Sequence, residues 1–400
     1  MAQLTPNCLT LCKKTYYNYI ISLKGYWKMK NIVDYAETEF STFEEKPFSS
    51  VDSLILSQFS YISFDGVVPE LRQGFKSVSI AQCLKAECFT SMLAETRDPK
   101  NNRKLILALA ASPRYRDIRM TCYVNEFDAV KEKQFSAVTY ILPDNSVYIA
   151  YRGTDDSLIG WKEDFNMAFV FPVPSQVRAL EYLLEISRLI PGKLIIGGHS
   201  KGGNLAVYSA FSCPASVQRR IQLVYDHDGP GFKEGVLDCE GYHQIEGRIQ
   251  KTIPQSSLIG MLLEGHKKYT VVESSRIGVM QHDPFSWKIA DSTFSTVEEV
   301  SDGARYVNRT IRDWIGGLSP DEREKFTDLL FGVLDAGDAT TFSEITLEWK
   351  KNFSAIFAAI RETDPEMKKF ISELTKDFGL LLVHNLRGKR KFLRALPPEQ

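Results

Sequence analysis

The stretch from Leu194 to Asn204 constrains the fold of this chain more than any other part of the sequence. It reads Leu-Ile-Ile-Gly-Gly-His-Ser-Lys-Gly-Gly-Asn, and a renewed apolar run follows it. The first apolar run predicts a buried strand and the second a helix. Between them, Gly198-x-Ser200-x-Gly202 has the spacing of a sharp strand-to-helix turn, in which glycines avoid a clash and the serine hydroxyl is lifted clear of the sheet. Ser200 is therefore a candidate nucleophile, although the same spacing also fits a tight turn with a capping serine.

Strand-like and helix-like segments alternate around this turn, which predicts an α/β protein with a mainly parallel sheet covered by helices on both faces. The strand candidates are residues 136–142, 147–151, 194–196, 221–225, 248–253 and 269–273. The first two flank a Pro-Asp-Asn-Ser turn and predict a hairpin. The helix candidates before the last strand are residues 48–61, 177–190 and 203–211.

The loop after the strand at 147–151 is a candidate for binding a developing negative charge. It reads Arg-Gly-Thr-Asp from Arg152, and a glycine at this place lets backbone N–H groups turn into a cavity. In acyl transfer, one oxyanion donor comes from such a loop and the other from the residue after the nucleophile. The predicted donors are the amides of Thr154 (or Asp155) and Lys201. A polar loop with a helix cap is the alternative interpretation.

A serine nucleophile needs a histidine to take its proton. The chain has six histidines, at positions 199, 227, 243, 266, 282 and 384. Only His282 lies in a loop after the last predicted strand, where a base is expected in the chain order serine, acid, histidine. His282 is the predicted general base, with a structural loop histidine as the alternative.

The histidine in turn needs a carboxylate that orients it and stabilises its charge. Asp228 follows the strand after the Ser200 helix, in a Gly-Pro-Gly turn, and is the first choice. Asp226 is the second choice because alternation would place it on the same side of the strand. Glu264 is the third. An aspartate at position 228 would also serve to cap the turn after it.

The composition is that of an ordinary globular protein. The chain has 400 residues, 44% hydrophobic and 25% charged, with a formal net charge of −1. A charge near zero gives no reason to expect nucleic acid or an anionic membrane as a partner, and no apolar run reaches the length of a membrane span. Seven scattered cysteines predict neither a disulfide framework nor a zinc site, so a reducing cytoplasm is the expected location.

Three regions are expected along the chain. Residues 1–28 differ in composition from the rest of the chain, and we expect Met29 to be the native start. Residues 29–292 are predicted to form the sheet domain, with a helical insertion at about 66–128 that is either a mobile lid or a static layer. Beyond Thr293 we expect only helices, so that residues 293–400 form a helical region packed on the sheet domain.

Several motifs form a joint pattern along most of the chain. They are Arg152-Gly-Thr-Asp-Asp156, Trp161-Lys-Glu-Asp-Phe-Asn166, Gly198-His-Ser-Lys-Gly-Gly-Asn-Leu205, Asp228-Gly-Pro-Gly-Phe232, Pro254-Gln-Ser-Ser257 and His282-Asp-Pro-Phe-Ser-Trp287. From about Met29 to the helical C-terminus, the chain resembles the bacterial Mbeg-like family of α/β-hydrolase-fold proteins, which is related to the class 3 lipases. The resemblance implies hydrolase chemistry and, for the Arg-Gly-Thr loop, a part in the oxyanion hole.

The chain departs from the class 3 lipases at one position. Those enzymes usually carry the triad acid after the penultimate core strand, where this chain has Gln255-Ser256. A complete triad therefore requires the acid to have moved to Asp228. The resemblance implies no particular substrate, because fold alone does not determine function.

The expected function is that of a serine hydrolase of lipase or esterase type, which cleaves a small-molecule or lipid (thio)ester through an acyl-enzyme on Ser200. This chemistry needs no metal or organic cofactor. Two alternatives remain: a non-catalytic protein of the same fold that binds a lipid or a protein partner, and an acyltransferase that uses the same residues. Oligomeric state and acyl-chain preference are not predicted.

Overall fold

The structure is a computed structural model that describes residues 30–94, 96–155 and 158–319, with a few single residues beyond. The expected N-terminal extension 1–28, the expected start at Met29 and the helices expected after residue 320 lie outside these ranges. Within the described residues, no helix is both long and apolar enough to span a membrane.

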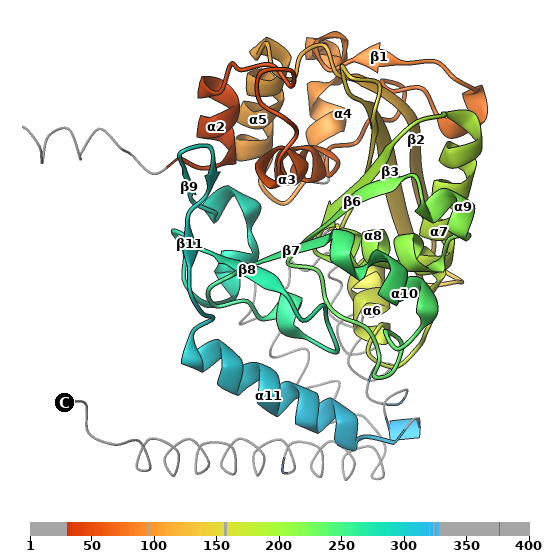
Figure 1. The fold of residues 1–400 in the computed structure, drawn as a ribbon, viewed down its shortest axis with the longest axis vertical. Helices are drawn as coiled ribbons and strands as arrows, with labels where there is room; N and C mark the ends of the chain where they lie inside the picture. Colours follow the sequence, from red (N-terminus) through yellow and green to blue (C-terminus); the bar gives the residue numbers. More distant parts are fainter. Residues whose placement is uncertain are drawn as a thin grey trace, which may run out of the picture.

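A twisted sheet of nine described strands forms the centre of the molecule (Figure 1). Its order is β1-β2-β3-β4-β5-β6-β7-β8-β11; β4 to β8 are parallel, and the strands at both ends pair antiparallel. The strands are β1 (Val78–Ser79), β2 (Arg119–Asp128), β3 (Lys133–Ile141), β4 (Val147–Tyr151), β5 (Leu194–His199), β6 (Ile221–His227), β7 (Ile249–Pro254), β8 (Tyr269–Val272) and β11 (Thr296–Val297). The predicted hairpin is confirmed as β3 and β4, and the predicted parallel core as β4 to β8.

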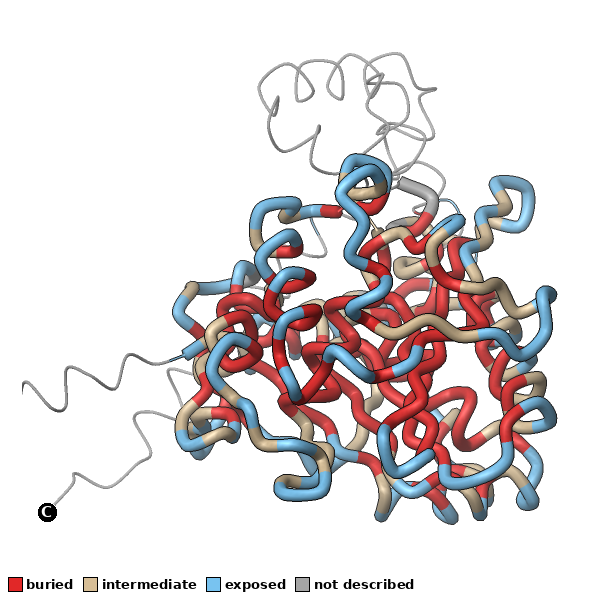
Figure 2. The backbone as a smooth tube through the Cα atoms, turned by 90° about the horizontal axis from the view of Figure 1, so that it is seen from above, coloured by how far each residue is buried: buried red, intermediate tan, exposed pale blue. Residues whose placement is uncertain are grey.

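Helices cover both faces of the sheet. One face carries α2 (Ile32–Thr38), α3 (Ser50–Phe59), α4 (Phe89–Leu93) and α5 (Pro99–Ala111), drawn red to orange in Figure 1. The other carries α7 (Pro174–Leu189), α8 (Lys201–Ser212) and α10 (Glu240–Ile245), drawn green. The remaining helices are α6 (Leu158–Asn166), α9 (Ala215–Gln218) and α11 (Asp302–Gly317). Figure 2 shows the result, with the buried backbone in the interior and the exposed residues at the rim.

Helix α3 shows how the sequence places a helix against this sheet. Ser49 and Asp52 form a reciprocal capping box at its N-terminus, which satisfies backbone N–H groups that have no partner within the helix. Apolar residues of this helix, such as Leu54 and Phe59, are fully buried. Their burial stabilises the fold by roughly 2 kcal/mol for each side chain.

The expected helical insertion at 66–128 is only partly helical. It contains α4 and α5, but its last ten residues form β2, which pairs with β3 over most of its length. The prediction of helix for residues 119–128 was therefore wrong. Thr121, Tyr123 and Val124 are β-branched or aromatic, and such residues fit a pleated surface better than a helix.

The expectation that strands end at Thr293 was also wrong. Thr293–Phe294 (β10) pairs with Ile289–Ala290 (β9), and β11 adds an antiparallel edge to β8 in the central sheet. The first described helix after Thr293, α11, consequently begins only at Asp302. A strand of two residues carries no periodic signal, because it is defined by the neighbour with which it pairs.

Candidate active site

Ser200 occupies a strained turn between β5 and α8. Its backbone has φ 59° and ψ −133°, a conformation that costs an L-residue of order 1–3 kcal/mol. The glycines of the motif are required by close approach: a Cβ atom on Gly198 would lie 2.2 Å from the carbonyl carbon of Gly202, and one on Gly202 would lie 2.1 Å from the Tyr151 oxygen. The serine itself is partly exposed. The turn therefore has the geometry of a nucleophile elbow.

Asp228 and His282, 54 residues apart, are joined by a short hydrogen bond between His282 Nδ1 and Asp228 Oδ2 of 2.6 Å. Asp228 follows β6, is fully buried and has φ 54°. His282 ends a short 3₁₀ helix, Gly278–His282. Because an ionised carboxylate only accepts hydrogen bonds, Nδ1 of His282 carries the proton and Nε2 is left as the proton acceptor, which is the arrangement a general base requires.

The ring of His282 lies against the elbow. The imidazole of His199, the residue before Ser200, has its ring centroid 4.5 Å from that of His282. Among the described contacts, Ser200 Oγ and the His282 ring are not joined by a hydrogen bond. In enzymes without substrate, this contact is often long and shortens only in the reacting complex.

The two other candidate acids have different partners. Asp226 is buried in an ion pair with Lys251, at 2.9 Å, and accepts the Gly229 amide at 2.8 Å. Burial raises the pKa of Asp226, and Lys251 opposes that rise. The Glu264 carboxylate accepts the Gly235 amide at 2.9 Å on the surface. Of the three candidates, the structure brings only Asp228 to His282.

The loop with the predicted oxyanion donor packs against the elbow. A Cβ atom on Gly153 would lie 2.6 Å from the His199 carbonyl oxygen. The next residue, Thr154, is buried, and its hydroxyl donates to Asp164 Oδ2. Neither the Thr154 amide nor the Lys201 amide donates a hydrogen bond to any described residue. Two free N–H groups beside a nucleophile, one of them at a helix N-terminus, can bind an oxyanion.

The side chain of Lys201 attaches the elbow to β3 and α6. Its Nζ lies 3.0 Å from Glu163 Oε2 and 2.9 Å from the Gln134 carbonyl oxygen, and the ammonium group is fully buried. Asp164, next to this pair, has its pKa raised to about 6 by burial, with Lys201 acting in the opposite direction. These contacts join β3 and α6 to the start of α8. They fix the position of the Lys201 backbone.

Three residues that were not predicted as site residues belong to its hydrogen-bond network: Ser257, Tyr61 and His199. Ser257 Oγ donates to Asp228 Oδ1 at 2.5 Å, and the Gly260 amide donates to the same oxygen at 3.1 Å. A signal for Ser257 existed, since it follows the strand after which the class 3 lipases carry their acid. Tyr61, by contrast, lies 138 residues before His199, which its hydroxyl contacts, and nothing local marks it.

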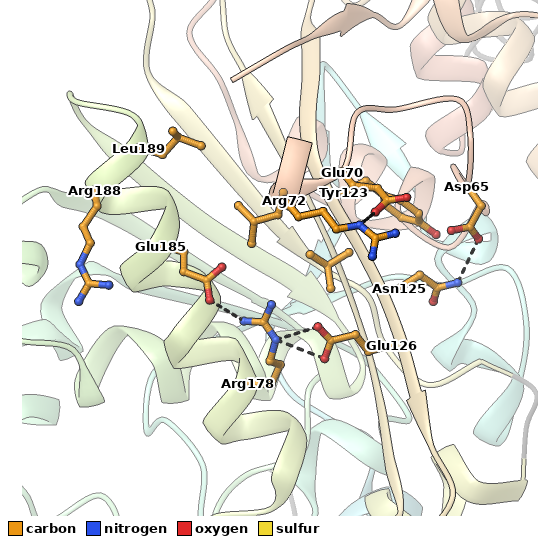
Figure 3. A pocket seen from close by; sticks show the side chains of 12 residues that line it. Asp65, Glu70, Arg72, Tyr123, Asn125, Glu126, Arg178, Glu185, Arg188 and Leu189 are labelled. Carbon is orange, nitrogen blue, oxygen red and sulfur yellow. Dashed lines mark hydrogen bonds and ion pairs between the residues drawn. The ribbon is translucent and has the colours of Figure 1, made fainter. Parts of the chain in front are cut away.

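A groove of about 740 Å³ lies elsewhere, between the edge of β2, the loop near Glu70 and α7 (Figure 3). Arg178 lies between Glu126 and Glu185 in it, and Asn125 bonds Asp65. None of its lining residues is Ser200, Asp228 or His282. Within the part of the chain that the structure describes, no cluster of His, Cys, Asp or Glu residues could hold a metal ion.

A mainly parallel sheet, a serine elbow between a central strand and a helix, and an Asp–His pair at the carboxyl ends of later strands together define the α/β-hydrolase fold. The chain belongs to the Mbeg1-like family, whose sequence pattern matches residues 109–332.

Solved structures of lipases are similar to parts of the chain at low identity. Rhizomucor miehei lipase in its propeptide complex is 14% identical, with 56% of this chain and 67% of that chain covered and a TM-score of 0.33. A triacylglycerol lipase with a serine protease triad is 15% identical, with coverages of 59% and 82% and a TM-score of 0.33. The lipase from Rhizopus microsporus var. chinensis is 11% identical, with coverages of 58% and 85% and a TM-score of 0.31. No curated protein sequence matches the chain.

Proposed function

We propose that this protein is a serine hydrolase of lipase or esterase type that cleaves a carboxylic ester or thioester. The observation that carries the proposal is the 2.6 Å hydrogen bond from His282 to Asp228, formed beside a strained and partly exposed serine. A serine becomes nucleophilic near neutral pH when a neighbouring histidine can take its proton. Such a histidine has a buried carboxylate hydrogen-bonded to Nδ1 and a free Nε2.

The proposed reaction has two halves. Ser200 Oγ attacks the ester carbonyl while His282 Nε2 takes its proton, and Asp228 stabilises the imidazolium that forms. The amides of Lys201 and Thr154 bind the oxyanion of the tetrahedral intermediate. The C–O or C–S bond then breaks, the leaving group takes the proton from His282, and the acyl group stays on Ser200. Water, activated by His282, attacks the acyl-enzyme, so that the carboxylic acid leaves and Ser200 regains its proton.

Labelling with a fluorophosphonate probe tests this proposal. We expect the wild-type protein to be labelled and the Ser200→Ala variant to be unlabelled, with Ser256→Ala as a control that keeps full labelling. His282→Ala and Asp228→Asn should each slow labelling by roughly 10³–10⁴-fold, because the first removes the base and the second favours the wrong tautomer. Equal labelling of the wild type and the Ser200→Ala variant would contradict the proposal.

The absence of a Ser200–His282 hydrogen bond among the described contacts favours a second candidate, a protein of this fold that binds a lipid or a partner without turnover. It predicts that the folded wild-type protein resists the probe altogether. An acyltransferase would label like the hydrolase, but it would pass the acyl group to an added alcohol or thiol in preference to water.

We also propose a reducing compartment for this protein, the cytoplasm. The five cysteines that the structure describes are all free, and three of them are buried. Buried free thiols behave as small apolar side chains and need no oxidising environment.

A further inference from the structure

His199 contacts the candidate base in two ways. Its Nε2 lies 2.8 Å from the carbonyl oxygen of His282, and its ring lies beside the His282 ring with an interplanar angle of 34°. The residue is 4% exposed. Both the backbone and the ring of His282 therefore rest on the residue that precedes the nucleophile.

The partners of His199 determine its tautomer. A carbonyl oxygen only accepts hydrogen bonds, so Nε2 must carry the hydrogen and Nδ1 must be an acceptor. The Tyr61 hydroxyl lies 3.1 Å from Nδ1 and donates to the His199 carbonyl oxygen at 3.3 Å, so its single hydrogen is shared between these two acceptors. Burial lowers the pKa of His199 well below its ordinary value, and burial raises that of Tyr61. The pair is thus a neutral imidazole and a neutral phenol.

We propose that Tyr61 and His199 are positioning residues that hold the backbone and ring of His282, so that its Nε2 is directed at Ser200. This inference rests on the proposed hydrolase function. Asp228 alone holds one ring nitrogen and leaves the ring free to pivot around that bond. The His199 ring blocks this rotation of the His282 ring. The Nε2–H group of His199 holds the backbone carbonyl of His282. Tyr61 holds His199 in place through its contacts with the carbonyl oxygen and Nδ1 of that residue.

The kinetics of fluorophosphonate inactivation test the proposal, because they separate probe binding (KI) from the bond-forming step (kinact). His199→Leu should lower kinact by about 30- to 100-fold, since a misplacement of about 1 Å costs about that much. Tyr61→Phe should lower it by about 3- to 10-fold. His199→Gln should recover to within about threefold of the wild type, because its amide nitrogen can donate to His282 and its oxygen can accept from Tyr61. KI should stay within about twofold throughout.

Tyr242→Phe is the matched control, since Tyr242 also bonds a histidine Nδ1, that of His266 at 2.8 Å, outside this site. It should leave kinact unchanged. Wild-type kinact in folded His199→Leu, or a His199→Gln variant no faster than His199→Leu, would overturn the proposal.

Nuclear magnetic resonance of the histidine rings gives a test that does not depend on catalysis. If the wild-type protein is not labelled, the proposed function fails, and the positioning arrangement is still decided by this measurement. We expect His199 to be a neutral Nε2–H tautomer from pH 7 to pH 5, and Tyr61→Phe to broaden or shift the His282 ring signals. A His199 ring that titrates near pH 6.5, or that carries its hydrogen on Nδ1, would refute the arrangement.

Discussion

At the scale of single residues, the site depends on backbone conformations that L-residues rarely adopt. Ser200 and Asp228 both have positive φ, at 59° and 54°. Each is held by hydrogen bonds to a neighbouring strand: the Ser200 amide donates to the His227 oxygen at 2.9 Å, and the Asp228 amide donates to the Thr252 oxygen at 2.8 Å. These hydrogen bonds to the sheet thus offset the backbone strain at Ser200 and Asp228. The strained conformations turn both side chains away from the ends of their strands.

Ser257 provides a test of how Asp228 is held. Ser257→Ala removes the 2.5 Å hydrogen bond to Asp228 Oδ1 and leaves that oxygen with the Gly260 amide as its partner. A hydrogen bond to a charged group contributes about 1.5–3 kcal/mol, so we expect the rate of probe labelling to fall by about tenfold or more. Stopped-flow or gel-based labelling measures this rate.

Ser256→Ala is the control for that experiment, because the Ser256 hydroxyl bonds Ser301 at 3.1 Å and does not contact Asp228. Equal labelling rates in the two variants would show that Ser257 does not act through the acid.

At the scale of elements, a buried ion pair attaches α3 to the segment after α5. Arg114 Nε and Nη2 each lie 2.8 Å from an oxygen of Asp52, and both side chains are fully buried. The Tyr115 hydroxyl donates to the same carboxylate at 2.6 Å. The Arg114 guanidinium also donates to the carbonyl oxygens of Ser41 and Lys46, which ties the chain before α3 to this point.

Replacement of either Asp52 or Arg114 by an apolar residue should destabilise the protein strongly. We expect Asp52→Ala to lower the free energy of unfolding by about 3–5 kcal/mol, because an unpaired guanidinium would remain buried. Urea denaturation followed by tryptophan fluorescence measures the loss. In the double variant Asp52→Ala/Arg114→Met, part of the loss should be recovered, since no buried charge remains; a double variant that loses the sum of both single effects would contradict this explanation.

Helix α5 follows from the local sequence pattern, whereas strand β2 does not. Leu105, Ile106 and Leu109 lie on the buried side of α5 as a helical period requires, whereas Leu107 is exposed. Residues 119–128 show a buried run followed by alternation of exposed and half-buried residues. They form β2 because β3 lies antiparallel beside them. Pairing across a sheet is a tertiary choice that propensity alone does not decide.

At the scale of the whole molecule, buried histidines make stability depend on pH. His227 bonds Thr252 Oγ1 at 2.7 Å and Ser53 Oγ at 2.9 Å, and so links β6, β7 and α3 inside the fold. Burial lowers the pKa of His227 from 6.5 to about 3. Below about pH 6.5 the unfolded chain takes up a proton on this ring that the folded protein does not. Stability is therefore lost as the pH falls from about 6.5 towards 3.

His227→Gln should remove this source of acid sensitivity. One proton corresponds to about 1.4 kcal/mol per pH unit, so the gap in unfolding free energy between the wild type and the variant should narrow by roughly 2 kcal/mol between pH 7 and pH 5. Urea unfolding at both pH values measures it. The exposed His243→Gln is the control, and a gap that stays constant for His227→Gln would contradict the assignment.

The sequence by itself determined the parallel core, the hairpin, the Ser200 turn and the family, because each rests on local signals: apolar runs of strand length, turn residues, and glycines at positions where any Cβ atom would clash. It also ranked Asp228 above Asp226 and Glu264, because Asp228 follows a predicted strand in a Gly-Pro-Gly turn. Only the tertiary structure joined His282 to Asp228, paired Asp226 with Lys251, and brought Tyr61 to His199 and Ser257 to Asp228. The physical reason is that hydrogen bonds between residues far apart in the chain depend on how sheet and helices pack, and no local pattern encodes them.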